Sequence, residues 1–398
     1  MNKLSSIAYY VTDKISSNDI SLSEYVTTDC ILQNKKGREV ASNLPPQPCC
    51  LTRYQRGDIL IANIRPYLKK VWFADIDGGA SSDVLVFRVK EGHSPSFLYA
   101  VLLQDSFFDY VMQGAKGSKM PRGDKEQILR YEMPTLSCSE ESIGTFFLNL
   151  DKKIRLNEQI NQNLEAMAKQ LYDYWFVQFD FPNEEGKPYK SSGGEMLWND
   201  KLKRNIPVGW HCGNLFEIAV FTNGLACQKF RPKDDEMPLP VIKIREMHDG
   251  ISVDTEEVTS NIPESVKVYN GDVLFSWSAS LEVMLWAYGL GGLNQHIFKV
   301  TSANDFPKSF YYFQLLDYVN VFKKMAEARK TTMGHITQDH LQQSTIAIPD
   351  NKDIADKFEE LISPIFKQIV KLQEEISNLI KQRDELLPLL MNGQITIE

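Results

Sequence analysis

Two polar, basic loops contain the residues of this chain that are best suited to binding phosphates and base edges. Residues 113–122 read Gln-Gly-Ala-Lys-Gly-Ser-Lys-Met-Pro-Arg, and residues 328–337 read Ala-Arg-Lys-Thr-Thr-Met-Gly-His-Ile-Thr. Glycine permits close approach of a ligand, lysine and arginine bind phosphate, and arginine, hydroxyl and imidazole groups form hydrogen bonds with base edges. The candidates are Lys116, Ser118, Lys119, Arg122, Arg329, Lys330, Thr331, Thr332 and His335. Solvated loops without a function have similar compositions, but recurrence of the same residue types favours DNA contact.

A second pair of candidate loops follows directly after two similar strand-like runs. Residues 63–70 supply Arg65, Lys69 and Lys70, whereas residues 276–282 supply Ser276 and Ser278 and no basic side chain. Side chains of both kinds are used to contact phosphates and bases. The difference in charge suits two surfaces that read different sequences.

The motifs of catalysis are absent from the sequence. We find no glycine-rich nucleotide loop ending in Gly-Lys-Ser/Thr and no Gly-x-Ser-x-Gly nucleophile elbow. The six histidines are scattered, and the six cysteines include no Cys-x-x-Cys pair, which predicts reduced thiols and no metal site. The turn with which amino-methyltransferases hold a base, Asn/Asp-Pro-Pro-Tyr/Phe, is also missing, because residues 44–47 read Leu-Pro-Pro-Gln. The sequence therefore predicts a binding protein rather than an enzyme.

Composition limits how this chain can bind nucleic acid. The net charge is −8, and neither half of the chain is a basic domain, so DNA contact requires local clusters or partners that add positive charge. Apolar residues occur in short runs, none near the roughly 20 residues of a membrane span, and the N-terminus does not resemble a signal peptide. We expect a cytoplasmic protein with no membrane contact.

The candidate loops lie in a tandem duplication. Residues 54–62, Tyr-Gln-Arg-Gly-Asp-Ile-Leu-Ile-Ala, return at 268–276 as Val-Tyr-Asn-Gly-Asp-Val-Leu-Phe-Ser, so Gly57 recurs 214 residues later as Gly271. Two further glycines before a strand-like run, at 78–79, recur at 291–292. Runs rich in Ile, Val and Phe between Gly and Pro predict sheets, and residues 97–112 predict helix. A period this long predicts two whole domains rather than a solenoid.

Each half ends in a long helix with a heptad seam. The first seam consists of Leu150, Ile154, Asn157, Asn161, Leu164, Ala168 and Leu171. The second, 215 residues later, consists of Ile365, Ile369, Leu372, Ile376, Leu379, Arg383 and Leu386. Alternating spacings of four and three are typical of a coiled coil. Because a whole domain separates the two helices in sequence, we expect them to pair antiparallel.

Two features of the first helix allow alternative interpretations. Asn157 and Asn161 occupy seam positions that favour aliphatic residues, either as mild frustration or, as we prefer, as amides that pair and fix the register. Trp175 and Phe176 belong to an aromatic cluster at the end of the helix. They are either a staple between helix and domain or a docking surface for another subunit.

The order of these segments resembles a specificity subunit of a type I restriction-modification system. The resemblance covers nearly the whole chain and rests on residues 160–172, 175–180, 187–196, 206–210, 271–276, 294–298 and 333–337. The chain begins with Leu-Ser-Ser-Ile-Ala at 4–8, which matches Leu-Phe-Glu-Ile-Ala at 215–219, but lacks the Pro-x-Gly-Trp that precedes the second copy.

The resemblance implies an α+β fold with two pseudo-repeated α/β target recognition domains separated by two long antiparallel coiled-coil helices. The expected parts are a first recognition domain (1–138), a spacer helix (139–180), a linker (181–205), a second recognition domain (206–350) and a C-terminal spacer helix (351–398). Each domain would read one half of a split double-stranded DNA target. The helices would set the gap between the two half-sites and recruit the partner subunits. The residues that would do so are Ile154, Asn157, Asn161, Leu164, Leu171, Trp175, Phe176, Ile369, Leu372, Ile376, Leu379 and Leu386.

The expected partners are two modification subunits that methylate adenine and restriction subunits that translocate and cleave DNA. S-adenosylmethionine, ATP and Mg²⁺ would bind to those subunits, and this chain would hold no cofactor. The alternatives are a coiled-coil adaptor whose domains bind proteins and, less favoured, an enzyme with an unrecognised site. DNA affinity of the modification complex with and without this chain separates the first two.

Overall fold

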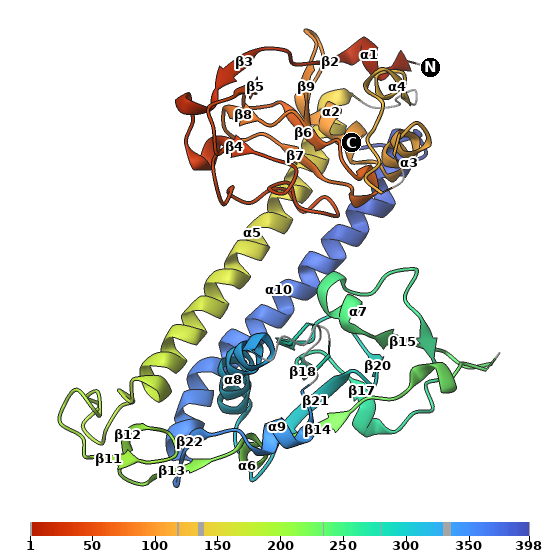
Figure 1. Ribbon diagram of the computed structural model, residues 1–398. Coiled ribbons are helices and arrows are strands. Elements are labelled where there is room, and N and C mark those ends of the chain that lie inside the picture. Colours follow the sequence, from red (N-terminus) through yellow and green to blue (C-terminus); the bar gives the residue numbers. More distant parts are fainter. Residues whose placement is uncertain are drawn as a thin grey trace. The chain divides into compact units, whose positions relative to one another are not determined.

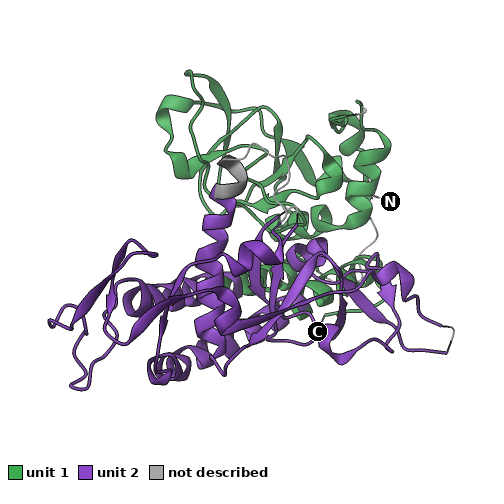
Figure 2. Cartoon of the chain, turned by 60° about the horizontal axis from the view of Figure 1, so that its bottom comes forward, with its two compact units in different colours: residues 1–156, 378–398 green, residues 157–377 purple. Residues whose placement is uncertain are grey.

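The computed structural model describes residues 2–117, 119–133, 139–233, 235–278, 280–328 and 336–397. The chain forms two compact units (Figure 2). Unit 1 consists of Met1–Leu156 and Asn378–Glu398, and unit 2 consists of Asn157–Ser377. The borders between the units therefore fall inside the two long helices, α5 (Glu140–Tyr172) and α10 (Asp353–Met391), and not at their starts.

Unit 1 contains two four-stranded sheets (Figure 1). The first is antiparallel throughout and has the order β2 (Ala8–Tyr10), β9 (Val84–Val89), β6 (Ile59–Ala62) and β7 (Val71–Phe73). The second has the order β3 (Lys14–Ser16), β5 (Cys50–Tyr54), β8 (Gly78–Ala80) and β4 (Tyr25–Val26). All four residues of β6 are buried, as a strand with apolar residues on both faces requires.

The core of unit 1 lies between the first sheet and helices from both ends of the chain. Helix α2 (Pro95–Leu103) is buried along nearly its whole length, and α3 (Asp105–Gln113) contributes Phe107 and Phe108. Ile143 and Phe147 of α5 join the same cluster, together with Leu387 and Leu390 of α10. Unit 1 is therefore completed by the C-terminal helix.

Unit 2 repeats this architecture. Its first sheet has the order β14 (Ala219–Asn223), β21 (Ile297–Ser302), β18 (Val273–Ser276) and β19 (Glu282–Leu285), which matches that of unit 1 strand by strand. Its second sheet has the order β16 (Glu257–Val258), β15 (Leu239–Ile242), β20 (Gly291–Leu293) and β17 (Lys267–Val268). The parallel pair β15–β20 matches the parallel pair β4–β8. The predicted duplication is confirmed.

The repeated glycines explain why the second sheets align. A Cβ atom on Gly78 would lie 2.2 Å from the carbonyl oxygen of Glu24, and one on Gly291 would lie 3.0 Å from the carbonyl oxygen of Pro240. Only glycine fits such a close approach of two backbones. The copies differ in the fourth strand: β3 pairs with β5 at one edge in unit 1, and β16 pairs with β15 at the other edge in unit 2.

The remaining elements also recur in pairs. Helices α1 (Leu4–Ile7) and α6 (Leu215–Ile218) open the two copies, as the match between residues 4–8 and 215–219 predicts. Strand β1 (Asn2–Lys3) pairs with β10 (Glu132–Met133), and β13 (Trp210–Gly213) pairs with β22 (Ile346–Pro349). The other helices are the short α4 (Lys125–Ile128), α7 (Ile244–Asp249) and α9 (Gln338–Gln342), and the longer α8 (Lys308–Ala328).

Helices α5 and α10 pair antiparallel in each unit. In unit 1, Asp151 of α5 faces Arg383 of α10. In unit 2, the ring of Tyr172 lies 6.2 Å from that of Phe358. Residue numbers therefore rise along α5 while the numbers of the facing residues on α10 fall. The antiparallel prediction is confirmed. Of the predicted seam, Ile154, Ile369, Leu372 and Ile376 are buried, and Leu164, Leu171, Leu379 and Leu386 are half-buried.

The seam asparagines do not pair as amides. Asn161 donates from Nδ2 to the main-chain oxygen of Ile369 at 3.3 Å, and its Oδ1 has no partner within the described chain. Both amide atoms of Asn157 are buried without a hydrogen bond to any described group. The predicted amide–amide contact is therefore wrong. Asn161 fixes the helix register through a backbone carbonyl instead, and Asn157 carries the cost of an unsatisfied buried amide.

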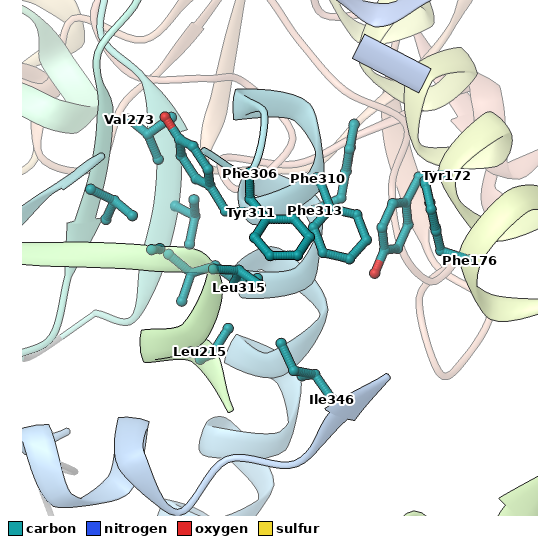
Figure 3. Packing of buried hydrophobic residues seen from close by; sticks show 14 of the residues in the cluster. Tyr172, Phe176, Leu215, Val273, Phe306, Phe310, Tyr311, Phe313, Leu315 and Ile346 are labelled. Atoms are coloured by element: carbon teal, nitrogen blue, oxygen red, sulfur yellow. The ribbon is translucent and has the colours of Figure 1, made fainter. Parts of the chain in front are cut away.

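Trp175 and Phe176 belong to the core of unit 2. Helix α5 continues into a π-helical turn, Asp173–Val177, in which the two side chains are only 6% and 3% exposed. Figure 3 shows Phe176 and Tyr172 beside Phe310 and Phe313, at ring distances of 5.0 and 5.1 Å. The staple interpretation is confirmed, and the docking interpretation is wrong because the rings are not accessible to a partner.

The segment predicted as a linker, 181–205, has ordered structure. The Asp180 carboxylate accepts hydrogen bonds of 2.7 Å from the amide and the hydroxyl of Ser191, and Phe181 stacks on Trp210. Strand β11 (Met196–Asn199) then pairs with β12 (Arg204–Pro207) in a hairpin. Residues 181–195 thus form hydrogen-bonded turns, as their composition predicts, and the hairpin follows them.

Candidate nucleic-acid interface

The two candidate loops of unit 1 lie against each other. The amide of Arg65 donates to the carbonyl of Pro121 at 2.8 Å, and Ile64 and Arg122 form an antiparallel bridge. Lys116 and Arg122 exchange two backbone hydrogen bonds of 2.9 Å, which close the second loop into a narrow turn. One loop follows β6 and the other follows α3, so the repeated strand and the helix beside it position a single surface.

The charged groups of this surface are not equally available. Arg65 and Lys119 are exposed, and neither forms an ion pair with another described residue. Lys116 pairs with Asp124 at 3.0 Å, and Arg122 pairs with Asp83 at 3.2 Å. Exposed pairs of this kind contribute little to stability, so phosphate oxygens can replace the carboxylates at small cost.

Lys69 and Lys70 anchor the first loop. The ammonium of Lys69 pairs with Asp105 at 2.9 Å, and that of Lys70 donates to the carbonyl of Thr28 at 2.7 Å. Arg65 and Lys69 flank a 3₁₀ turn and have φ values of 52° and 50°. Residues with side chains adopt this left-handed conformation only where the surrounding structure holds them in it. The two lysines therefore shape the loop, while Arg65 extends from it.

The candidate serines of unit 2 are structural. Ser276 is fully buried, donates from its hydroxyl to the carbonyl of Ser280, and accepts a hydrogen bond of 3.1 Å from the amide of Glu282. Ser278 is only 8% exposed. Predicting these two serines as DNA contacts was wrong, because the Ser276 hydroxyl forms hydrogen bonds within the β18–β19 hairpin and Ser278 is almost entirely buried.

Other polar residues occupy the equivalent surface of unit 2. Trp277 donates from Nε1 to the amide oxygen of Asn223 at 3.4 Å, and its ring lies 5.6 Å from that of His296. The amide of Ile336 donates to the carbonyl of Trp277 at 3.1 Å, so the second loop returns to the fold beside the first, as in unit 1. Asn223 and His296 are not among the predicted DNA contacts, although residues 294–298 carry part of the resemblance.

Six of the candidate residues lie outside the described residues: Ser118, Arg329, Lys330, Thr331, Thr332 and His335. The described neighbours of residues 329–335 in sequence are helix α8, which ends at Ala328, and Ile336 and α9, which follow. The role of the six candidate residues in DNA contact stays a prediction.

A separate polar hollow of about 410 Å³ lies at the opening helix of unit 2. It is lined by Asn214, Phe216, Glu217, Asn304, Gln338, Asp339 and Gln342. Two carboxylates and no cation among these residues make the hollow unsuitable for phosphate.

Beside this hollow, His211 of β13 lies between two carboxylates. Burial lowers its pKa, but hydrogen bonds to Asp350 and Glu217 outweigh burial, and the pKa is raised above the ordinary value of 6.5. The contribution of the His211 ion pairs to the free energy of unfolding is therefore fully present below pH 6.5 and disappears as the pH rises through the raised pKa of His211. Because all three groups are substantially exposed, we expect at most about 1 kcal/mol. Unfolding free energies at pH 5.5 and 8.5 should show this loss in the wild type but not in His211→Gln.

The described residues contain no group of three or more His, Cys, Asp or Glu side chains that a metal ion would need. Cys30, Cys49, Cys50, Cys212 and Cys227 are free thiols, and Cys138 lies outside the described residues. No helix in the described ranges is both long and apolar enough to cross a lipid bilayer.

Known proteins are similar to this chain in sequence. Residues 207–382 match the family model "Type I restriction modification DNA specificity domain". The chain is 23% identical to the type I restriction enzyme MjaIX specificity subunit of Methanocaldococcus jannaschii over 96% of its own length and 87% of that protein. It is 24% identical to the HindI specificity subunit of Haemophilus influenzae over 93% and 94% of the two chains.

A solved structure confirms the fold. The type I restriction-modification S subunit of M. genitalium aligns with a TM-score of 0.59 over 98% of this chain and 95% of that one, at 13% identity. The similarity extends over both copies of the duplication and both long helices, and includes the half that the family model does not cover. Its second half thus matches the type I restriction modification DNA specificity domain, and nearly the whole chain is similar to specificity subunits of type I restriction enzymes.

Proposed function

We propose that each unit of this chain reads one half of a bipartite double-stranded DNA target. The observation that carries this proposal is the duplicated loop pair. In unit 1, the loop after β6 is hydrogen-bonded to the loop after α3. In unit 2, Trp277 in the loop after β18 is hydrogen-bonded to Ile336, which lies between α8 and α9. A chain that reads two half-sites needs two such surfaces in equivalent positions, with different side chains on each.

Some of the candidate residues are assigned to phosphate contacts and others to base contacts. Arg65 and Lys119 carry free positive charge for the backbone of DNA, and Lys116 and Lys330 are assigned the same role. Arg122 and His335 are assigned to base edges, because arginine forms paired hydrogen bonds with guanine and imidazole can donate or accept. In unit 2, Asn223 and His296 are additional candidates, since both lie beside Trp277.

The proposed assembly supplies what this chain lacks. Two modification subunits would bind the chain and transfer methyl groups to adenine with S-adenosylmethionine, and restriction subunits would use ATP and Mg²⁺ to translocate and cleave DNA. The whole assembly would be located in the cytoplasm. The net charge of −8 agrees with a chain whose partners provide much of the positive charge that DNA binding requires.

Alanine substitution tests the division between phosphate and base contacts. Lys116→Ala should weaken binding to every DNA sequence alike and lower the dependence of affinity on salt. Arg122→Ala should cost about 1–3 kcal/mol and relax discrimination at only one half-site. The measurement is competition binding of the complex between this chain and its modification subunits against single-base variants of both half-sites.

Lys381→Ala serves as the matched control, because this side chain is 72% exposed on α10 and forms only a loose pair with Glu385. It should leave affinity unchanged. Unchanged affinity in all the loop variants, or relaxation of the half-site read by unit 2 when Arg122 is replaced, would contradict this placement of the DNA surface. A complex that binds DNA equally well without this chain would favour the adaptor alternative.

A further inference from the structure

A buried lysine joins loop 63–70 of unit 1, called the DNA loop below, to the C-terminal helix α10. Lys35 is 4% exposed, and its ammonium lies 2.8 Å from a carboxylate oxygen of Asp105 and 3.1 Å from one of Asp384. Asp105 also pairs with Lys69 of the DNA loop at 2.9 Å, and Asp384 pairs with Arg383 at 3.0 Å. Charges of alternating sign thus run without a break from the loop to α10.

The backbone follows the same path. The amides of Asn34 and Lys35 donate to the carbonyls of Leu68 and Lys69 at 2.9 and 3.0 Å, so residues 33–37 lie directly against the DNA loop. Asn34 and Lys35 have φ values of 55° and 62°, a left-handed conformation that persists only where neighbouring groups impose it. Lys35 is thus held at both its backbone and its side chain.

Helix α5 closes the other side of this segment. A Cβ atom on Gly37 would lie 3.0 Å from Cζ of Arg155, and Gly37 has a φ of 83°. Arg155 pairs with Asp151 at 2.6 Å, and Asp151 accepts a hydrogen bond of 3.0 Å from the hydroxyl of Tyr99. Residues 33–37 therefore fill the space between the DNA loop and the helix pair of unit 1.

The network is arranged so that each buried charge has partners. Burial raises the pKa of the Asp384 carboxyl, but Arg383 and Lys35 outweigh burial and hold that pKa below its ordinary value. Buried charges are tolerated only when they are paired, and removing one partner leaves the other unsatisfied. The arrangement therefore favours one position of the loop over others.

We propose that Lys35 and Asp384 are positioning residues for DNA reading, which hold loop 65–70 against the helix pair so that the C-terminal helix completes the first DNA surface. The proposal rests on the function proposed above and deepens it. Neither residue touches DNA in this proposal. Both act through Asp105 and Lys69, and the sequence separation of 349 residues between them joins the two ends of the chain in one site.

Unit 2 connects its helix differently. Lys169 occupies the position 215 residues before Asp384, carries the opposite charge, and pairs directly with Asp317 of α8 at 3.0 Å. No third residue bridges this pair among the contacts that the described chain makes. Disturbing Lys35 should therefore affect the half-site read by unit 1 and leave that of unit 2 unchanged.

The test is Lys35→Met in the complex of this chain with its modification subunits. This variant leaves Asp105 paired with Lys69 and Asp384 paired with Arg383, so no carboxylate loses its last partner. The probes are duplexes that carry the methylated motif of the host and its single-base variants. We expect about tenfold weaker binding, with relaxed discrimination at the half-site that Arg122→Ala also relaxes, and an unchanged midpoint of thermal unfolding.

Three further variants make the result decisive. Lys35→Arg keeps the charge and should restore discrimination, and Lys381→Met, which removes an exposed lysine from the same helix, should have no effect. Asp384→Asn combined with Lys35→Met should weaken binding no more than Lys35→Met alone, because residues that act through one contact are not additive.

Discrimination that Lys35→Met leaves intact, or relaxes equally at both half-sites, would overturn the proposal. The same holds for a lowered unfolding midpoint that accounts for the whole loss of binding. A wild-type complex that does not discriminate among the duplexes would instead refute the proposed function itself, and the inference with it.

Discussion

Four residues inserted into α5 after Leu156 should abolish assembly or change the unread gap between the half-sites. Four helical residues add about 6 Å and turn the following helix by about 40° beyond one full turn. Asp151 must still face Arg383 in unit 1, and Asn161 must still reach Ile369 in unit 2. An insertion in one helix alone cannot preserve both contacts, so one pairing must break.

A matched insertion in α10 after Ser377 is the control for this experiment. It lengthens the second helix by the same amount and restores both pairings. At about 3.4 Å per base pair, the double insertion should widen the unread gap by about two base pairs. The gap is measured by sequencing the methylated sites of a host that carries each variant with its partner subunits. Methylated sites with the same gap and yield after the single insertion would show that the helices do not act as a ruler.

Replacement of Phe176 by alanine should destabilise unit 2 by about 3–5 kcal/mol, the usual cost of removing a buried aromatic ring. The ring lies 5.0 Å from both Phe310 and Phe358 and 6.1 Å from Trp210, so alanine would leave a cavity where the end of α5 meets the domain. A loss of this size is a large fraction of the stability of a domain. Partner subunits would then be lost because unit 2 unfolds.

Denaturant unfolding followed by tryptophan fluorescence measures this effect, and Val177→Ala is the matched control. Val177 is the next residue in the same π-helical turn but is 40% exposed, so its truncation should change the unfolding free energy by less than about 0.5 kcal/mol. An unchanged unfolding midpoint in Phe176→Ala, combined with loss of the modification subunits, would show that the ring contacts a partner after all.

The repeated parts of the fold were predictable because local chemistry determines them. Glycines at 78 and 291 are required by the close approach of backbones, and heptad spacing in the helices predicts a seam whatever surrounds it. The fourth strands β3 and β16 lie outside the matched segments, and nothing in either copy predicts the edge at which each is added.

The errors at the site have a different cause. Ser276 ends strand β18 and Ser278 follows it, and whether residues at such a strand end are buried or exposed depends on the path of the hairpin. Trp175 and Phe176 form an aromatic cluster that has the same composition in a core and in a docking surface.

The network around Lys35 was beyond prediction for a third reason. Its two partners, Asp105 and Asp384, are distant in sequence, and each of the three residues alone looks like an ordinary surface charge. Only the packing of the C-terminal helix into unit 1 brings them together. Pairings that depend on contacts between the two ends of a chain leave no local pattern in the sequence.

The decisive experiment is the sequencing of methylated sites in a host that carries this chain with its modification subunits. We expect a motif of two short specified half-sites separated by a gap of fixed length without sequence preference. We also expect Arg122→Ala to relax one half-site and leave the other unchanged. A continuous motif, or methylation with the same motif in a host from which this chain has been deleted, would contradict the claim that the two units read the two halves of a split target.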